Sequence, residues 1–174
     1  MTTLLLTIAE SPGQSQVFKT QELALKQAFP GDSVVQRRVL FLTDKQVSEI
    51  EKLAKTTVES KIVTYYEGAR NNSTLGYAFF ETNIVRTKPE TFLVLLTPAG
   101  TVKKVEMLAF YEPMDYFPTA NWFKLFKGKR LNDTLWPKRG IHNITGATLT
   151  VRAVTKGVRT ILAIYQIAIS GVTN

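Results

Sequence analysis

The segment from His142 to Thr150 combines residue types that can do chemistry. Thr145, Thr148 and Thr150 supply three hydroxyls, and Gly146 stands between the first two, where a turn meets an amphipathic stretch. Free amides and the positive end of the dipole at a helix N-terminus attract anions, so these residues would form a seat for a phosphate group. On local chemistry alone a simpler interpretation is favoured, in which Thr145 or Thr148 only caps the helix.

Other kinds of site are excluded by composition. The chain has no cysteine and one histidine, which rules out disulfides, zinc thiolates, iron–sulfur clusters, cysteine nucleophiles and multi-histidine metal sites. No Gly-x-Ser-x-Gly elbow or glycine-rich nucleotide loop occurs. Two acidic pairs, Glu112 with Asp115 and Glu81 with Glu90, are interpreted as solvated charge. We therefore assign no catalytic residue and no metal site, and any redox cofactor must be organic or held by oxygen ligands.

The formal net charge of +8 favours anionic partners in general. The basic residues are scattered in short groups, however, and no recognised nucleic-acid motif accompanies them. A basic solvated surface is the favoured interpretation, and a nucleic-acid-binding module is kept only as a weak alternative.

The elements that must position the 142–150 segment follow from the apolar patterns. Residues 1–16 are interpreted as a flexible segment or a trimmed leader, and residues 17–60 as a helix, a strand and a second helix that opens with the Thr43–Gln46 capping box. Residues 61–112 alternate with the period of two that predicts an antiparallel sheet. A long amphipathic helix is predicted after Thr148, fraying or turning into a strand near its end. The expected fold is α+β, a two-layer arrangement of sheet and helices without a membrane-spanning helix.

The core Thr145-Gly146-Ala147-Thr148 with Thr150 resembles the flavinylation motif of the FMN-binding domain family. This family includes the G subunit of Rnf electron-transport complexes and the C subunit of the sodium-translocating NADH:quinone reductase. Its motif is Asp-x-x-[Ser/Thr]-Gly-Ala-[Ser/Thr]-x-[Ser/Thr], and FMN is joined through its phosphate to the second hydroxyl residue. In this sequence that residue is Thr148, and His142 stands where the family has Asp.

Weaker likenesses precede the motif in the family's order. They are Gly76–Phe79, Thr101–Val105, Glu112-Pro113 and the run Trp122–Lys129. The resemblance covers roughly residues 60–170 and implies that residues 61–174 form an FMN-binding domain, packed with residues 17–60 as one globular unit.

Each candidate site residue then has an expected role toward FMN. Thr148 would carry the phosphoester, Gly146 would let the backbone approach the phosphate, and Ala147 would keep bulk away. Thr145 and Thr150 would donate hydrogen bonds to phosphate oxygens.

The remaining candidates concern charge and the flavin ring. His142 or Lys129 would partly neutralise the phosphate. Trp122 and Leu149 are candidates for an apolar platform under the ring, although a tryptophan at such a position is more often simply a core residue. Glu112 is expected to orient a loop beside the ring or to be simply an exposed acid.

The resemblance implies a small electron-transfer flavoprotein rather than a stand-alone enzyme. Its FMN would be donated from FAD by a magnesium-dependent flavin transferase, and its redox partners would belong to an extracytoplasmic or membrane-associated chain. The alternative is a non-catalytic scaffold or binding domain of the same fold that has lost flavin or binds it loosely. The replacement of Asp by His142 favours this alternative, whereas the intact Thr-Gly-Ala-Thr core argues against it.

Overall fold

A six-stranded antiparallel sheet forms the centre of the computed structural model, which describes residues 16–132 and 134–171. The strand order is β1-β6-β5-β4-β3-β2. From β2 to β6, each strand therefore pairs with the next strand in the sequence, as the alternating pattern predicts. The strands are β1 (Gln16–Val17), β2 (Val34–Phe41), β3 (Ile62–Arg70), β4 (Ser73–Ile84), β5 (Pro89–Leu96) and β6 (Val102–Phe110). The flexible segment predicted for residues 1–16 lies outside the described residues except for Gln16, which is in β1.

Two tight turns fix the register of the hairpins. Asn71 and Asn72 join β3 to β4 with φ values of 50° and 58°, the conformation that matches the twist of a two-residue hairpin. Gly100, with φ of 70°, closes the turn between β5 and β6. A side chain at Gly100 would collide with the ring of Tyr165, so the turn also needs the space that glycine leaves.

Both N-terminal helices begin at threonine caps, and the capping box predicted at Thr43 is confirmed. Helix α1 (Gln21–Ala28) follows Thr20, whose hydroxyl accepts from the amide of Leu23 at 3.2 Å. Helix α2 (Asp44–Ala54) opens with a full capping box: Thr43 Oγ1 accepts from the Gln46 amide at 3.2 Å, and Gln46 Oε1 accepts from the Thr43 amide at 2.9 Å.

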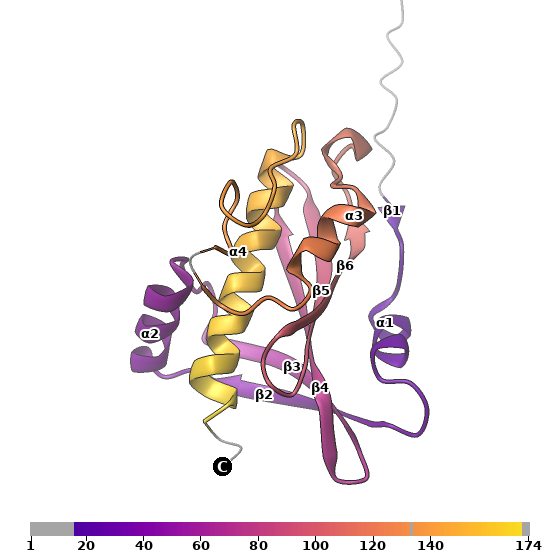
Figure 1. The fold of residues 1–174 in the computed structure, drawn as a ribbon, viewed down its shortest axis with the longest axis vertical. Coiled ribbons are helices and arrows are strands. Elements are labelled where there is room, and N and C mark those ends of the chain that lie inside the picture. Colours follow the sequence, from indigo (N-terminus) through magenta and orange to yellow (C-terminus); the bar gives the residue numbers. More distant parts are fainter. Residues whose placement is uncertain (1–15, 133, 172–174) are drawn as a thin grey trace, which may run out of the picture.

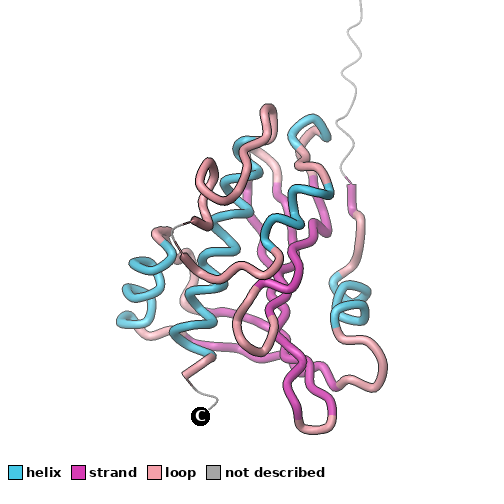
Figure 2. Tube along the Cα trace, viewed as in Figure 1, coloured by secondary structure: helices cyan, strands magenta, loops and turns pink. Residues whose placement is uncertain are grey.

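The helices cover both faces of the sheet (Figures 1 and 2). The long helix α4 (Thr148–Ile164) lies across one face with α2 beside it. The short segments η1 (Met114–Tyr116), α3 (Ala120–Phe123) and η2 (Lys124–Phe126) follow β6 on the way to α4. The α+β class predicted from the sequence is confirmed, and α1 adds a smaller apolar layer on the opposite face.

Strand β5 shows how the two cores are divided. Phe92 and Val94 point to the core under α4, whereas Leu93 and Leu95 point to the core under α1, and all four side chains are buried. Because successive strand residues face opposite sides, one apolar run serves both layers.

The C-terminal helix does not turn into a strand within the described residues. It continues beyond Ile164 as the π-helical turn η3 (Tyr165–Ile169). Among the residues that the structure describes, no helix has both the length and the apolar composition needed to cross a membrane.

Candidate functional site

The N-terminus of α4 is not capped by a side chain. Thr148 is the first helical residue, Ala147 takes the cap position, and no side chain accepts a hydrogen bond there. The first intrahelical bond runs from the amide of Val151 to the carbonyl of Ala147 at 2.9 Å, so the amides of the first turn have no acceptor within the helix. The interpretation of Thr145 or Thr148 as a simple helix cap is therefore wrong.

The Thr148 hydroxyl is half-buried and only weakly held. It donates to the carbonyl of Ile144 and accepts from Nδ2 of Asn143, both at 3.4 Å, near the limit for a hydrogen bond. Gly146 comes two residues earlier with φ of 88°, and a Cβ there would lie 3.3 Å from the carbonyl oxygen of Asp115. The left-handed conformation at Gly146 brings the chain into α4 so that the Thr148 side chain stays accessible.

A small cavity of about 160 Å³ opens beside this hydroxyl, and we call it the Thr148 hollow. Four predicted site residues come together in it, namely Gly146, Thr148, Leu149 and Thr150. Its other lining residues, Val85, Arg86 and Tyr116, come from two segments that the sequence patterns do not connect with the motif.

Arg86 gives the hollow a positive charge. Its guanidinium lies 4.6 Å from the centre of the Tyr116 ring, and Nη1 donates to the Tyr116 hydroxyl at 3.0 Å. Tyr116 is in turn tied to the motif, because Thr150 Oγ1 donates to its carbonyl at 2.9 Å. An arginine held in this way can neutralise an anion next to Thr148, a role that the sequence analysis gave to His142 or Lys129.

Glu112 fixes the turn that carries Arg86. Its Oε1 accepts from the backbone amides of Arg86, Thr87 and Lys88 at 3.1, 2.8 and 2.9 Å. The residue is only 3% exposed, so it is not a solvated acid, and it does orient a loop beside the hollow. Burial raises the pKa of Glu112, but the three amides and the charge of Arg86 outweigh burial and hold this pKa below its usual value.

We expect Glu112→Ala to destabilise the protein by about 2–3 kcal/mol, because three backbone amides lose a charged, buried acceptor. Chemical denaturation would measure the loss, and hydrogen exchange should show faster exchange at the amides of Arg86 to Lys88. Asp115→Ala is the matched control, since Asp115 is an exposed acid nearby. Equal losses in the two variants would contradict the role given to Glu112.

A second buried acid, Glu90, lies close enough to Glu112 for their charges to interact. It is fully buried at the start of β5, and neither carboxyl oxygen has a hydrogen-bond partner. Burial, with a contribution from the charge on Glu112, raises the pKa of Glu90 to about 8. The interpretation of Glu90 and Glu112 as solvated charge is therefore wrong, because both side chains are buried.

Trp122 lies in the core rather than open to a ligand. It is 3% exposed, and the rings of Phe123 and Phe126 pack against it at centroid distances of 5.1 Å. Its Nε1 donates to the carbonyl of His142 at 2.7 Å, while the His142 residue is exposed. Trp122 thus supports the backbone that leads into the motif, and its role as a flavin platform stays a prediction.

The other predicted site residues divide between surface and interior. Thr145 is exposed, Leu149 is 43% exposed, and Ala147 is buried. Thr150 is also buried, and its hydroxyl proton is committed to Tyr116. The carbonyl of Lys129 accepts from the amide of Val102 at 2.9 Å, at the opposite end of β6 from Glu112. The roles proposed for these residues toward phosphate remain predictions.

The sequence analysis missed Arg86 and Tyr116 because nothing in the spacing of residues links them to the motif. The sequence analysis also missed a second cavity, of about 300 Å³, whose lining includes Asn143, Trp136 and three basic residues. Among residues 16–132 and 134–171, no group of three acidic or histidine side chains could hold a metal ion.

Residues 87–163 match the family model of the FMN-binding domain. The matched segment begins in the turn that Glu112 holds, includes the Thr145–Thr148 motif and ends within α4. The resemblance is confirmed at the level of the family, because residues 87–163 match the FMN-binding domain, and this match supports FMN as the cofactor. The match does not distinguish the Rnf G subunit or the C subunit of the NADH:quinone reductase from other members. In a comparison with curated proteins, no sequence matched the chain.

Proposed function

We propose that this protein is an electron-transfer flavoprotein that carries FMN covalently through a phosphoester to Thr148. The observation that carries the proposal is the position of Thr148 Oγ1 at the uncapped N-terminus of α4, in a hollow that Arg86 also lines. A phosphate on this oxygen would meet the free amides of a 17-residue helix and a fixed cation. The residues present therefore fit the phosphate of FMN.

The attachment is a phosphoryl transfer from FAD, catalysed by a magnesium-dependent flavin transferase. The bond from Thr148 oxygen to the FMN phosphorus forms, the bond between the two phosphates of FAD breaks, AMP leaves, and the threonine proton goes to a base outside this chain. The weak hydrogen bonds of the hydroxyl support this proposal, because little stabilisation is lost when the oxygen becomes an ester.

Once bound, FMN supplies the redox chemistry, and the protein holds and orients it. Leu149 is the exposed apolar residue of the Thr148 hollow, and Tyr116 provides an aromatic ring there. We propose that these two residues contact the flavin and that Arg86 balances the phosphate charge. The electrons would pass between redox partners of an extracytoplasmic or membrane-associated chain.

Intact mass after co-expression with a flavin transferase tests the proposal. We expect the parent chain to gain one FMN less one water and Thr148→Ala to gain nothing. Thr119→Ala is the matched control, because it removes an exposed hydroxyl outside the motif and should still be modified. Modification of Thr148→Ala, or an unmodified parent together with an active transferase, would contradict covalent attachment at Thr148.

The second candidate function is a scaffold or binding domain without firmly bound flavin, which His142 favours because the family has Asp at this position. His142 is exposed, so a His142→Asp variant should fold normally. Modification of His142→Asp but not of the parent would support this second candidate. Equal modification of both would remove the reason for it.

A further inference from the structure

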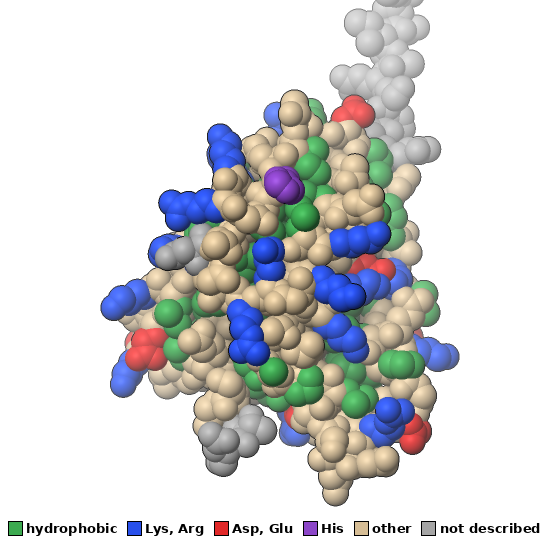
Figure 3. Space-filling view, in the orientation of Figure 1, with side chains coloured by type: hydrophobic (Ala, Val, Ile, Leu, Met, Phe, Trp, Pro, Cys, Tyr) green, Lys and Arg blue, Asp and Glu red, His purple; other side chains and the backbone are tan. Residues whose placement is uncertain are grey.

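The positive charge of the chain is concentrated in its last third. Residues 1–115 carry 13 basic and 13 acidic side chains, whereas residues 116–174 carry nine basic and one acidic side chain. This last third includes α3, α4 and the loops that lead to the motif. Figure 3 shows the face on which α4 lies, where Lys and Arg side chains greatly outnumber acidic ones. The whole net charge of +8 therefore comes from residues 116–174, the part of the chain that contains Thr148.

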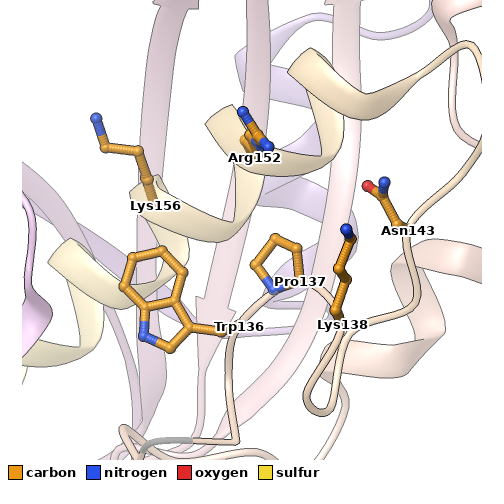
Figure 4. Close-up of a pocket in the computed structure, with 6 residues that line it drawn as sticks. All are labelled: Trp136, Pro137, Lys138, Asn143, Arg152 and Lys156. Atoms are coloured by element: carbon orange, nitrogen blue, oxygen red, sulfur yellow. The ribbon is translucent and has the colours of Figure 1, made fainter.

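Three of these basic residues surround a cavity of about 300 Å³, which we call the basic cleft. Figure 4 shows Lys138 from the loop and Arg152 and Lys156 from α4 extending around the rings of Trp136 and Pro137. The cleft therefore has an apolar base and a positive rim. Asn143 completes the lining.

The three cations of the cleft have no acidic partner. In the described part of the chain, the ion pairs join Lys19, Arg38, Lys61, Arg70 and Lys104 to acids in the first 106 residues. Lys138, Arg152 and Lys156 take part in none of these pairs and are all exposed. Cations gathered without counter-charges repel one another, so an anionic partner would be stabilised there.

The cleft adjoins the proposed attachment site. Thr148, Arg152 and Lys156 are spaced four residues apart on α4, so they lie along one face of the helix. Asn143 lines the cleft and donates to Thr148 Oγ1 at 3.4 Å. A partner seated in the basic cleft would therefore be next to a cofactor on Thr148.

We propose that the basic cleft is the docking site for the acidic surface of a redox partner protein, with protruding carboxylates between Lys138, Arg152 and Lys156. The identity of the partner as a redox protein rests on the proposed function, whereas the acidic chemistry rests on the cleft itself. Complementary charge of this kind speeds association and sets orientation.

A protein partner is favoured over the two other anionic macromolecules. A flat lipid surface does not fill a concave cavity, so lipid headgroups would meet only its rim. Single-stranded nucleic acid stacks successive bases on several aromatic side chains, but this cleft holds one, Trp136, and the guanidinium of Arg159 lies 4.5 Å from its ring centre.

Binding of a fluorescent hexaglutamate peptide to the unmodified chain tests the docking site without any flavin. The test variant combines Lys138→Glu, Arg152→Glu and Lys156→Glu. The control combines Lys26→Glu, Lys45→Glu and Lys52→Glu, three exposed lysines of α1 and α2, and has the same net charge.

At low salt we expect the cleft variant to bind the peptide at least about tenfold more weakly than the parent and the control to bind within about twofold of it. Equal weakening in both variants, or no binding by the parent, would overturn the proposal. The proposal would also be overturned if only the cleft variant lost binding to single-stranded oligonucleotide or to phosphatidylglycerol vesicles while it still bound the peptide. Should the Glu variant fail to fold, the same three changes to Gln repeat the test.

A second readout uses flavinylated protein and inorganic oxidants. Each fully reduced flavin gives two electrons to two ferricyanide ions, forming two ferrocyanide ions and releasing two protons. We expect the cleft variant to slow oxidation by ferricyanide and to speed oxidation by hexaammineruthenium(III), because one oxidant is an anion and the other a cation. Unchanged rates with both oxidants would overturn docking beside the flavin. If the chain never acquires FMN, the proposed function fails while the peptide experiment still decides on the cleft.

Discussion

Replacing Arg159 with methionine should lower the free energy of unfolding by about 3–5 kcal/mol. Arg159 is 1% exposed in the middle of α4 and donates to four backbone carbonyls. Nε donates to Ala54 at 2.7 Å and Nη2 to Leu53 at 3.1 Å, while Nη1 donates to Asn132 at 2.7 Å and Leu135 at 3.3 Å. Methionine keeps much of the apolar volume but leaves these carbonyls without a donor.

The large effect has a structural reason. Leu53 and Ala54 are in the last turn of α2, where helix carbonyls lack intrahelical partners, and Asn132 and Leu135 belong to the loop before the motif. One side chain thus binds α2 and this loop to α4. The cation also lies at the negative end of the α2 dipole, which adds to the stabilisation.

Urea denaturation followed by circular dichroism would measure the loss. Arg152→Met is the matched control, because it makes the same chemical change on an exposed position of the same helix. We expect the control to change the free energy of unfolding by less than about 0.5 kcal/mol. Similar values for both variants would show that the carbonyl contacts of Arg159 contribute little.

The second large effect is a loss of stability that Glu90 causes as the pH rises from about 5 to about 8. Its pKa is about 8 in the folded protein and near 4.5 when exposed, so between these values the folded state binds more protons than the unfolded state. Stability therefore falls as pH rises through this window. The expected fall between about pH 5 and about pH 8 is roughly 3 kcal/mol.

Glu90→Gln should remove this dependence, because the amide has nearly the shape of the protonated acid and does not titrate. We expect the variant to unfold at a clearly higher temperature than the parent at pH 8 and at a similar temperature at pH 5. The exposed Glu49→Gln on α2 is the control and should follow the parent at both values. Parallel melting curves for the parent and Glu90→Gln at all pH values would contradict a neutral Glu90 in the folded protein.

The folded state needs Glu90 neutral chiefly because its carboxyl is buried, and the charge of nearby Glu112 adds to this effect. Three amide donors stabilise the carboxylate of Glu112, whereas Glu90 has no hydrogen-bond partner. The opposite shifts of the two pKa values follow from this difference, since hydrogen bonds favour the charged form and burial favours the neutral one.

Local patterns in the sequence predicted the elements correctly where neighbouring residues decide the structure. The Thr43–Gln46 capping box and the alternation of β3 to β6 are examples, because each interaction is made within a helix turn or between adjacent hairpin strands. The motif core also predicted the family, and Thr148 does begin the long helix.

Such local patterns could not predict which of the site residues are exposed and which are buried. Trp122 belongs to the core, and Glu90 and Glu112 are enclosed, although the sequence suggested a ligand platform and solvated acids. Whether a side chain is buried depends on which distant segments pack over it, and the spacing of residues along the chain does not predict that packing.

What the sequence by itself determined is the kind of domain, the strands and helices, and the one hydroxyl on which the proposed attachment depends. Only the tertiary structure decided that Arg86 and Tyr116 share a hollow with Thr148 and that Lys138 joins Arg152 and Lys156 around Trp136. The physical reason is that Glu112 holds the turn that carries Arg86, while Arg159 holds the loop before the motif against α4, and such long-range contacts form only when the whole chain has packed.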